Sequence, residues 1–227
     1  MRCGAGCRTV VGGGGNGSEH TYALEVKPVR SQEIISNKYQ GGFRLKREEA
    51  LALLKKNLPN KNLQKHCLAA EAVMRRLARR FQEDEESWGL TGLLHDIDYE
   101  QTKDDPDRHS MEGARMLAEL GLAPEVVYAV KVHNERHGLP RLSRLDKALY
   151  AVDPLTGFIV AGALIRPEKR LAAVDVAFLT NRFKEKAFAR GANREQMQTC
   201  TELGLTLEEF IGLGLEAMQE KAEELGL

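Results

Sequence analysis

The chain has 227 residues, of which 42% are hydrophobic and 29% charged, a composition typical of a soluble globular protein with one ordinary core. Its 33 basic and 33 acidic residues give a formal net charge of zero, so the charge balance favours neither nucleic acid nor an anionic membrane as a partner. No run reaches the roughly 18 apolar residues of a membrane span, and the four cysteines form no disulfide framework, so we expect a reduced, cytoplasmic protein.

Residues 1–44 are rich in glycine and serine and show neither helical nor strand periodicity. No apolar stretch of signal-peptide length follows their basic residues. We predict that this segment is a disordered extension outside the fold. The letters GGFRL also indicate a mis-called start, with the natural protein beginning near Leu45, which mass spectrometry of the native N-terminus would test.

From Lys46 onward, apolar residues recur at helical spacing, without period-2 strands. The breaks contain Gly, Pro and Asn, which are typical where helices end and begin. The pattern predicts helices at about 47–57, 61–81, 85–96, 109–120, 124–136, 143–163, 193–203 and 206–224. We therefore expect one all-α domain over residues 45–227.

The segment GLLHDID at 92–98 ends an apolar run with a histidine and two acids. A buried carboxylate is costly unless it is paired or ligated. Four other predicted helices also carry a ligand-type residue on the apolar face, as His66 does in the series Leu63, His66, Ala70. The candidate metal ligands are His66, His95, Asp96, His109, His133 and Asp153.

A single histidine on an apolar face is more often a hydrogen-bonded core residue than a ligand. Four such helices beside the His95-Asp96 pair favour convergence on one interior instead. Imidazoles and carboxylates in a partly dry pocket are stabilised by a divalent cation, which offsets the desolvation of their charge. Mixed ligation of this kind suits Mn, Fe, Co, Ni or Zn better than Ca.

The order His66, His95-Asp96, Asp153 resembles the H…HD…D signature of the HD-domain superfamily of metal-dependent phosphohydrolases, over roughly residues 60–160. The resemblance implies an HD-type helical core with additional C-terminal helices. It also implies that these four residues hold one metal ion.

The segments RHSMEGARML and VKVHNERHG look like those of two-metal members, which implies a second ion held by His109 and His133 and bridged by Asp96. This order is similar to HDIG-type proteins, including bacterial HD hydrolases that cleave diadenosine tetraphosphate. Two positions depart from family patterns. Asp98 stands where HDIG-type members carry glycine, and Tyr99 where other members carry lysine or glutamate, so the general acid is not transferred by motif.

The resemblance implies hydrolysis of a phosphomonoester, phosphodiester or nucleotide by water that two divalent ions (Mn, Fe, Co, Ni, Zn or Mg) activate. Asp96 would bridge the ions. His137, four residues after His133, is a candidate catalytic proton donor, with an exposed helix-end histidine as the alternative. Candidate substrate contacts, each also readable as a solvated surface charge, are Lys103, Arg108, Arg136 and Lys147.

Two other function classes stay open. A non-catalytic HD-type nucleotide-binding regulatory module would keep the fold but lose ligands, whereas all six are present here. A closed structural metal site usually contains cysteine, which is absent from this set. We further expect a small phosphorylated partner such as a nucleotide, no membrane or nucleic-acid partner, and packing or a homodimer contact for the final helix.

Overall fold

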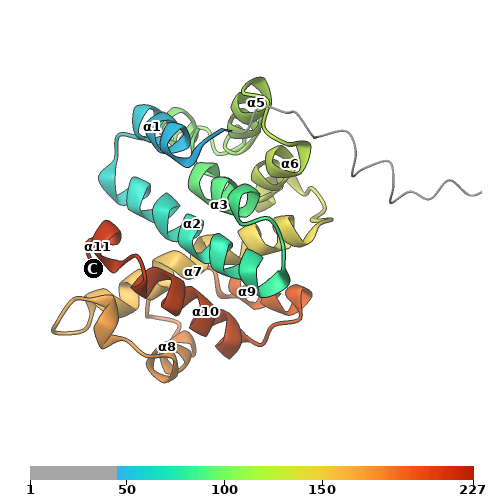
Figure 1. The fold of residues 1–227 in the computed structure, drawn as a ribbon. Helices are drawn as coiled ribbons and strands as arrows, with labels where there is room; N and C mark the ends of the chain where they lie inside the picture. Colours follow the sequence, from blue (N-terminus) through green and yellow to red (C-terminus); the bar gives the residue numbers. More distant parts are fainter. Residues whose placement is uncertain (1–44) are drawn as a thin grey trace, which may run out of the picture. The chain divides into compact units, whose positions relative to one another are not determined.

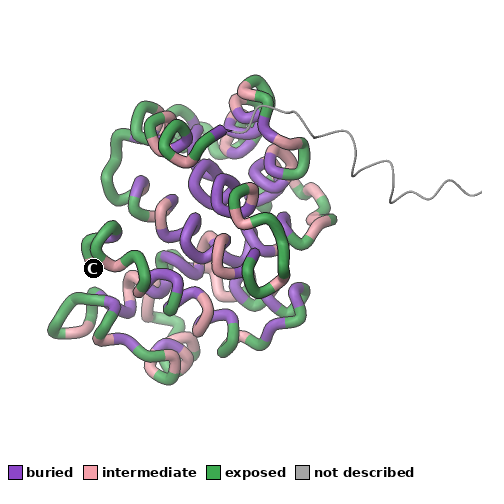
Figure 2. Tube along the Cα trace, viewed as in Figure 1, coloured by how far each residue is buried: buried purple, intermediate pink, exposed green. Residues whose placement is uncertain are grey.

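A computed structural model describes residues 45–227, and in that range the chain forms helices joined by turns, without a strand. The predicted all-α class is confirmed. The expected disordered extension, residues 1–44, lies outside the described residues. Figure 1 shows the helices arranged around α2 and α7, the two longest, and Figure 2 shows that buried residues concentrate on the helix faces that meet there.

The helices follow one another along the chain with short connections. Their bounds are α1 Arg47–Asn57, α2 Lys61–Phe81, α3 Glu85–Leu94, α4 Tyr99–Thr102, α5 Met111–Glu119, α6 Pro124–Val132, α7 Arg144–Leu164, α8 Val176–Phe183, α9 Arg194–Gln198, α10 Leu207–Gln219 and α11 Ala222–Leu225. Three short 3-10 segments, η1 to η3, cover Glu135–His137, Leu171–Ala173 and Thr199–Leu203.

Several predicted ends were wrong by a few residues, for local reasons. The helix expected to begin at 109 begins at Met111, because Ser110 has a φ of 70° and so cannot continue a right-handed helix. The helix expected over 124–136 ends at Val132, and the side chain of Asn134 then caps the 3-10 turn η1. The helix α8 was not predicted, although Asp175 caps its start by accepting a hydrogen bond from the Phe178 N–H.

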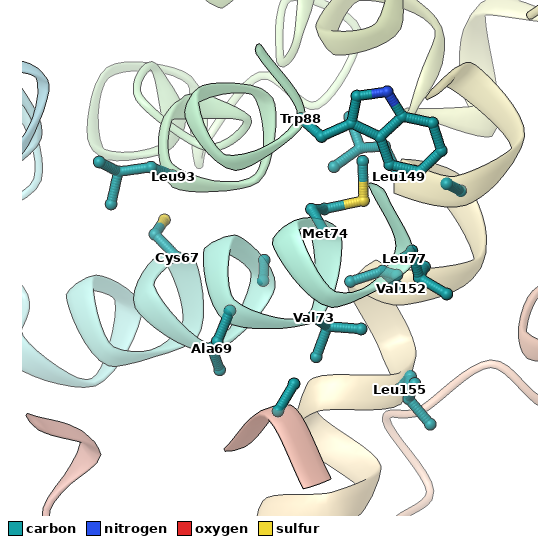
Figure 3. Close-up of a cluster of buried hydrophobic side chains, with 14 of the residues drawn as sticks. Cys67, Ala69, Val73, Met74, Leu77, Trp88, Leu93, Leu149, Val152 and Leu155 are labelled. Carbon is teal, nitrogen blue, oxygen red and sulfur yellow. The ribbon is translucent and has the colours of Figure 1, made fainter. Parts of the chain in front are cut away.

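The hydrophobic core lies between α2 and the helices that pack on it, α3, α7 and α10. Figure 3 shows part of this core, with Met74 of α2, Trp88 of α3 and Leu149 of α7 in one cluster. The helix α3 approaches α2 closely at Gly92, where an added Cβ would meet the Ala70 carbonyl oxygen at 2.7 Å. Only glycine permits this approach, which brings the end of α3 against the middle of α2.

The helix α7 is the most apolar long element of the described range. By length and composition it could cross a membrane, but 61% of its apolar window is buried inside the fold, as in the core helix of a globular domain. Its start is fixed by a capping box between Ser143 and Asp146. The helix continues through Pro154 and carries Asp153 at its centre.

Candidate metal centre

The structure brings together the six residues that the sequence singled out as ligands. The helices fix each position: one residue lies in the second turn of α2, one in the middle of α7, three at or just after the ends of α3 and α6, and one just before α5. Their side chains face one another at close range, and all six are buried or partly buried. The residues are His66, His95, Asp96, His109, His133 and Asp153.

One group of donor atoms combines α2, α3 and α7. The His66 Nε2 atom lies 3.1 Å from Asp153 Oδ1 and 3.6 Å from Asp96 Oδ2. The His95 Nε2 atom lies 3.5 Å from the same Asp96 oxygen and 3.8 Å from Asp153 Oδ1. The two imidazole Nε2 atoms are 3.1 Å apart. Two nitrogens and two carboxylate oxygens therefore surround one small volume.

A second group forms around the other oxygen of Asp96. His109 Nε2 lies 3.3 Å and His133 Nε2 3.5 Å from Asp96 Oδ1. The two imidazole rings meet edge to face with centroids 5.1 Å apart. The two carboxylate oxygens of Asp96 thus face different pairs of histidines, which is the arrangement of a carboxylate that can bridge two cations.

The two innermost histidines are oriented by backbone carbonyl groups. His95 Nδ1 donates to the Gly92 carbonyl at 2.8 Å, and His133 Nδ1 donates to the Val130 carbonyl at 2.6 Å. Because a carbonyl oxygen only accepts, each Nδ1 carries the proton. In the neutral ring, the lone pair then lies on Nε2 and points into the cluster, as metal-binding histidines require.

The two outer histidines are oriented by side chains instead. The Thr156 hydroxyl donates to the Asp153 carbonyl at 3.0 Å and accepts from His66 Nδ1 at 2.9 Å. His109 Nδ1 donates to Asp98 Oδ1 at 2.9 Å. All four imidazoles therefore direct Nε2 inward.

The sequence marked Asp98 as one of the two acids that end the apolar run, as a departure from a family pattern and as a further acid candidate, but not as a partner of His109. The structure shows that its side chain is fully buried and that its other oxygen accepts from the Gly113 N–H at 2.7 Å. Both oxygens are thus engaged, one of them in fixing the ring of His109. The spacing of two residues between Asp96 and Asp98 is the only sequence signal of this role. Thr156 had no signal, because its contact depends on how α2 and α7 cross.

The electrostatics of the cluster favour added positive charge. Burial lowers the pKa of the His95 imidazole, but the carboxylates of Asp96 and Asp153 outweigh burial and raise this pKa to about 9. Burial likewise opposes charge on His109, whereas hydrogen bonds that its ring donates to Asp96 and Asp98 raise its pKa to about 10. Burial would raise the pKa of Asp96, yet the surrounding histidines hold it well below its ordinary value.

This donor set fits divalent metal ions. Four imidazole Nε2 atoms and carboxylate oxygens converge, and each ring is fixed by a hydrogen bond behind it. Two overlapping groups have donor atoms within 4.8 Å of one another: His66, His95 and Asp96, and Asp96, His109 and His133. Asp153 joins the first group through its contact with His66.

The remaining predicted site residues lie outside the cluster. Because α6 ends at Val132, His137 does not continue the helical face of His133, and its Nε2 instead donates to the His109 carbonyl at 2.8 Å. Its catalytic role stays a prediction.

The four predicted substrate contacts lie in exposed or partly exposed positions. Lys103 pairs with Glu100, Arg108 with Glu112, and Arg136 with Asp107, in each case through an exposed cation. Lys147 lies in α7, partly buried.

Comparison with known families gives one match. Residues 63–163 match the HD domain family, a range that contains all six clustered residues. This match supports the resemblance to the HD-domain superfamily that the sequence indicated. The comparison with curated proteins found no match.

Proposed function

We propose that this protein, with an HD domain at residues 63–163, is a hydrolase that cleaves a phosphoric ester or anhydride bond of a small substrate such as a nucleotide, with two divalent cations. The observation that carries the proposal is that the two oxygens of the Asp96 carboxylate face different pairs of histidines. Its Oδ2 faces His66 and His95, and its Oδ1 faces His109 and His133. One buried carboxylate between two pairs of inward-facing nitrogens matches a two-cation site.

Divalent cations bound there would lower the pKa of water and stabilise charge on phosphoryl oxygens. The chain itself supplies rigidity and access. His95 and His133, which are 0% and 3% exposed, close the inner side of the cluster. The side chains of His66 and Asp153 are 21% and 32% exposed, so the phosphoryl group would approach from their side.

The chain also sets the protonation of the site. The Nδ1 hydrogen bonds hold each histidine in the tautomer that leaves Nε2 unprotonated in the neutral ring. Asp96 and Asp153 stay ionised at neutral pH, because the histidines lower the pKa of both. Without metal, the raised pKa values keep protons on His95 and His109. Once cations displace these protons, the six residues present acceptor atoms only. A proton for the leaving group has to come from outside the six residues.

The first experiment is metal analysis of the purified protein after reconstitution with Mn, Co, Fe or Mg. A phosphoesterase screen follows, with nucleoside monophosphates, nucleoside diphosphates and dinucleotides as substrates, diadenosine tetraphosphate included. We expect a stoichiometry approaching two ions and metal-dependent turnover. Nucleotide binding without turnover would favour the regulatory module instead. Absence of both metal binding and turnover would refute the proposal.

A further inference from the structure

The helix α7 exposes an apolar stripe beside the metal centre. From Asp153 onward, the residues of this helix that are not buried recur every three or four positions, so they form one line along its surface. A helix face in contact with water is normally polar, yet this stripe carries no polar side chain after its first residue. Its members are Asp153, Pro154, Gly157, Val160, Ala161 and Leu164.

Two hollows flank this stripe, and both begin at the candidate metal centre. The first, of about 480 Å³, lies between the stripe, the start of α2 and residues 225–227. The second, of about 360 Å³, lies between the stripe and residues 189–196. His66 and Gly157 line both hollows, and Asp153 lines the second. We call the stripe with its two hollows the α7 trough.

The wall formed by the segment before α9 is held in a fixed shape. The Arg194 guanidinium donates to the Ala189 carbonyl at 2.8 Å and to the Ala192 carbonyl at 3.0 Å. Phe188 packs edge to face on Phe158 of α7, with ring centroids 5.3 Å apart. This wall presents three small residues to the trough, Ala189, Gly191 and Ala192, and two polar ones, Asn193 and Gln196. The Asn193 side chain already accepts from the Gln196 N–H, and the Gln196 amide donates to the Tyr150 carbonyl. The hollow is therefore formed before any ligand arrives.

The lining of the first hollow is chemically simple. Apart from His66, its one charged side chain is Lys65, and most of the remaining lining is aliphatic or glycine. None of the ion pairs in the described range involves Lys65. Such a lining suits an apolar group with at most one further negative charge, and it lacks the several cations that a polyphosphate chain would require.

We propose that the α7 trough binds the organic group of the substrate, and that the substrate is a phosphoric ester of a largely apolar group. The inference rests on the proposed function, because the phosphoryl end is placed at the metal centre where His66 and Asp153 line the trough. The apolar group then extends along α7 over Gly157 toward Leu164.

Gly157 offers a direct test. An added Cβ at this exposed helix position would meet nothing within 4 Å, so a side chain can enter the trough without a clash at its first atom. Gly157→Phe should fill the trough. Gly157→Ala adds only a methyl group and is the matched control, because both substitutions replace a helical glycine.

Binding of n-alkyl phosphates from methyl to octyl is measured calorimetrically on the manganese-loaded protein. In the native protein and in Gly157→Ala, each added methylene should tighten binding about fourfold, the gain for burying one such group. In Gly157→Phe the chain-length dependence should disappear, while inorganic phosphate binding and manganese stoichiometry stay unchanged. Affinities independent of chain length in the native protein would overturn the inference and leave the proposed function intact.

A second measurement separates this inference from the metal chemistry. The metal-free protein is titrated with the fluorescent probe 8-anilinonaphthalene-1-sulfonate, and octyl phosphate is added as competitor. If octyl phosphate displaces the probe from the native protein and from Gly157→Ala, and Gly157→Phe no longer binds the probe, the α7 trough is an apolar binding site whether or not metal binds. Equal displaceable binding in all three proteins, or none in the native protein, contradicts it.

Discussion

Two buried polar clusters lie on α2, little more than one helical turn apart, and they balance their charge in opposite ways. The Glu71 carboxylate, 3% exposed, accepts from Arg47 Nε at 2.6 Å and from Arg75 Nε at 3.0 Å. Among residues 45–227, the carboxylates of Asp96 and Asp153 form their close ion-pair contacts with histidines alone. Arginine is always charged, whereas the charge of an imidazole depends on pH.

The difference separates a structural cluster from a functional one. At Glu71 the cations belong to the chain, so the cluster is complete when the protein has folded. At Asp96 the balancing charge is exchangeable: protons on His95 and His109 supply it, or metal ions replace them. A buried carboxylate that relies on an exchangeable cation is costly for folding alone, and this cost is the reason we propose cation binding for the Asp96 cluster.

The largest effect is expected from Asp96→Ala, which removes the carboxylate shared by both groups of donors. Metal binding should be lost, and activity should fall by more than about 10³-fold, because even one lost charge-stabilising donor costs about 10²–10³. Metal analysis and turnover measure this, with circular dichroism to show that the helices remain. Full turnover by this variant would contradict the proposal that the Asp96 cluster binds the catalytic cations.

Substitution of His109 or His133 should remove one of the two proposed cation positions. In His109→Ala or His133→Ala, we expect the bound metal to fall from two ions toward one, since both residues face the same oxygen of Asp96. His137→Ala is the control, because its ring contacts the His109 carbonyl rather than the cluster. Unchanged stoichiometry in the first two variants would indicate a mononuclear site.

The exchange of protons for metal predicts a pH dependence that the Glu71 cluster lacks. The raised pKa values of His95, about 9, and His109, about 10, mean that both rings are protonated at pH 7 without metal. Metal affinity should therefore rise with pH up to about 9, by about tenfold per pH unit for each proton displaced. Calorimetric titrations in buffers of different ionisation enthalpy count the released protons.

The same shifts fix the sign of the stability change in the metal-free protein. Because the folded pKa values lie above the ordinary value of 6.5, the two rings stabilise the fold fully below that pH. Their contribution is lost as the pH rises through 9 to 10. Metal-free protein that becomes more stable over that range, or metal binding without proton release, would contradict this picture.

A smaller effect is expected from Asp98→Asn. An amide has one oxygen for the two donors that Asp98 now accepts, His109 Nδ1 and the Gly113 N–H, so one of them would face an NH₂ group. The affinity for the second metal should fall about 10- to 100-fold, as for other partners of metal-bound histidines, with the first site unchanged. Glu100→Gln, which alters an exposed ion pair with Lys103, is the control.

Much of the site could be predicted because helical periodicity determines which residues face the core. His66 and Asp153 stand at positions where steps of three and four lead inward, and the helices did form there. The prediction for His137 used the same rule beyond its range. The helix α6 ends at Val132, and beyond the end of a helix the helical period no longer indicates which way a side chain points.

Other features could not be predicted because they depend on tertiary contacts. The contact of Thr156 with His66 joins residues 90 positions apart, and the partly buried pair of Arg47 with Glu71 spans 24. In the sequence, Thr156, Arg47 and Glu71 look like ordinary polar residues of helices, and nothing links Thr156 to His66. The trough is of the same kind, since a glycine at 157 indicates an opening only when the facing segments are in place.

The smallest functional effect, and the sharpest test of the comparison, is expected from Glu71→Gln. Loss of this charge leaves two arginines without their buried partner, which costs about 3–5 kcal/mol for fully buried pairs. The side chains of Arg47 and Arg75 are 30% and 16% exposed, so solvent should reduce the loss of unfolding free energy to about 2 kcal/mol. The midpoint of thermal unfolding of Glu71→Gln should fall by about 4–8 °C. Glu86→Gln, which removes the half-exposed partner of Arg75, is the control and should lower the free energy of unfolding by about a few tenths of a kcal/mol. Metal stoichiometry should stay at the native value in both variants, because the Glu71 cluster holds its own cations, and a loss of metal in Glu71→Gln would mean that the two clusters on α2 are not independent.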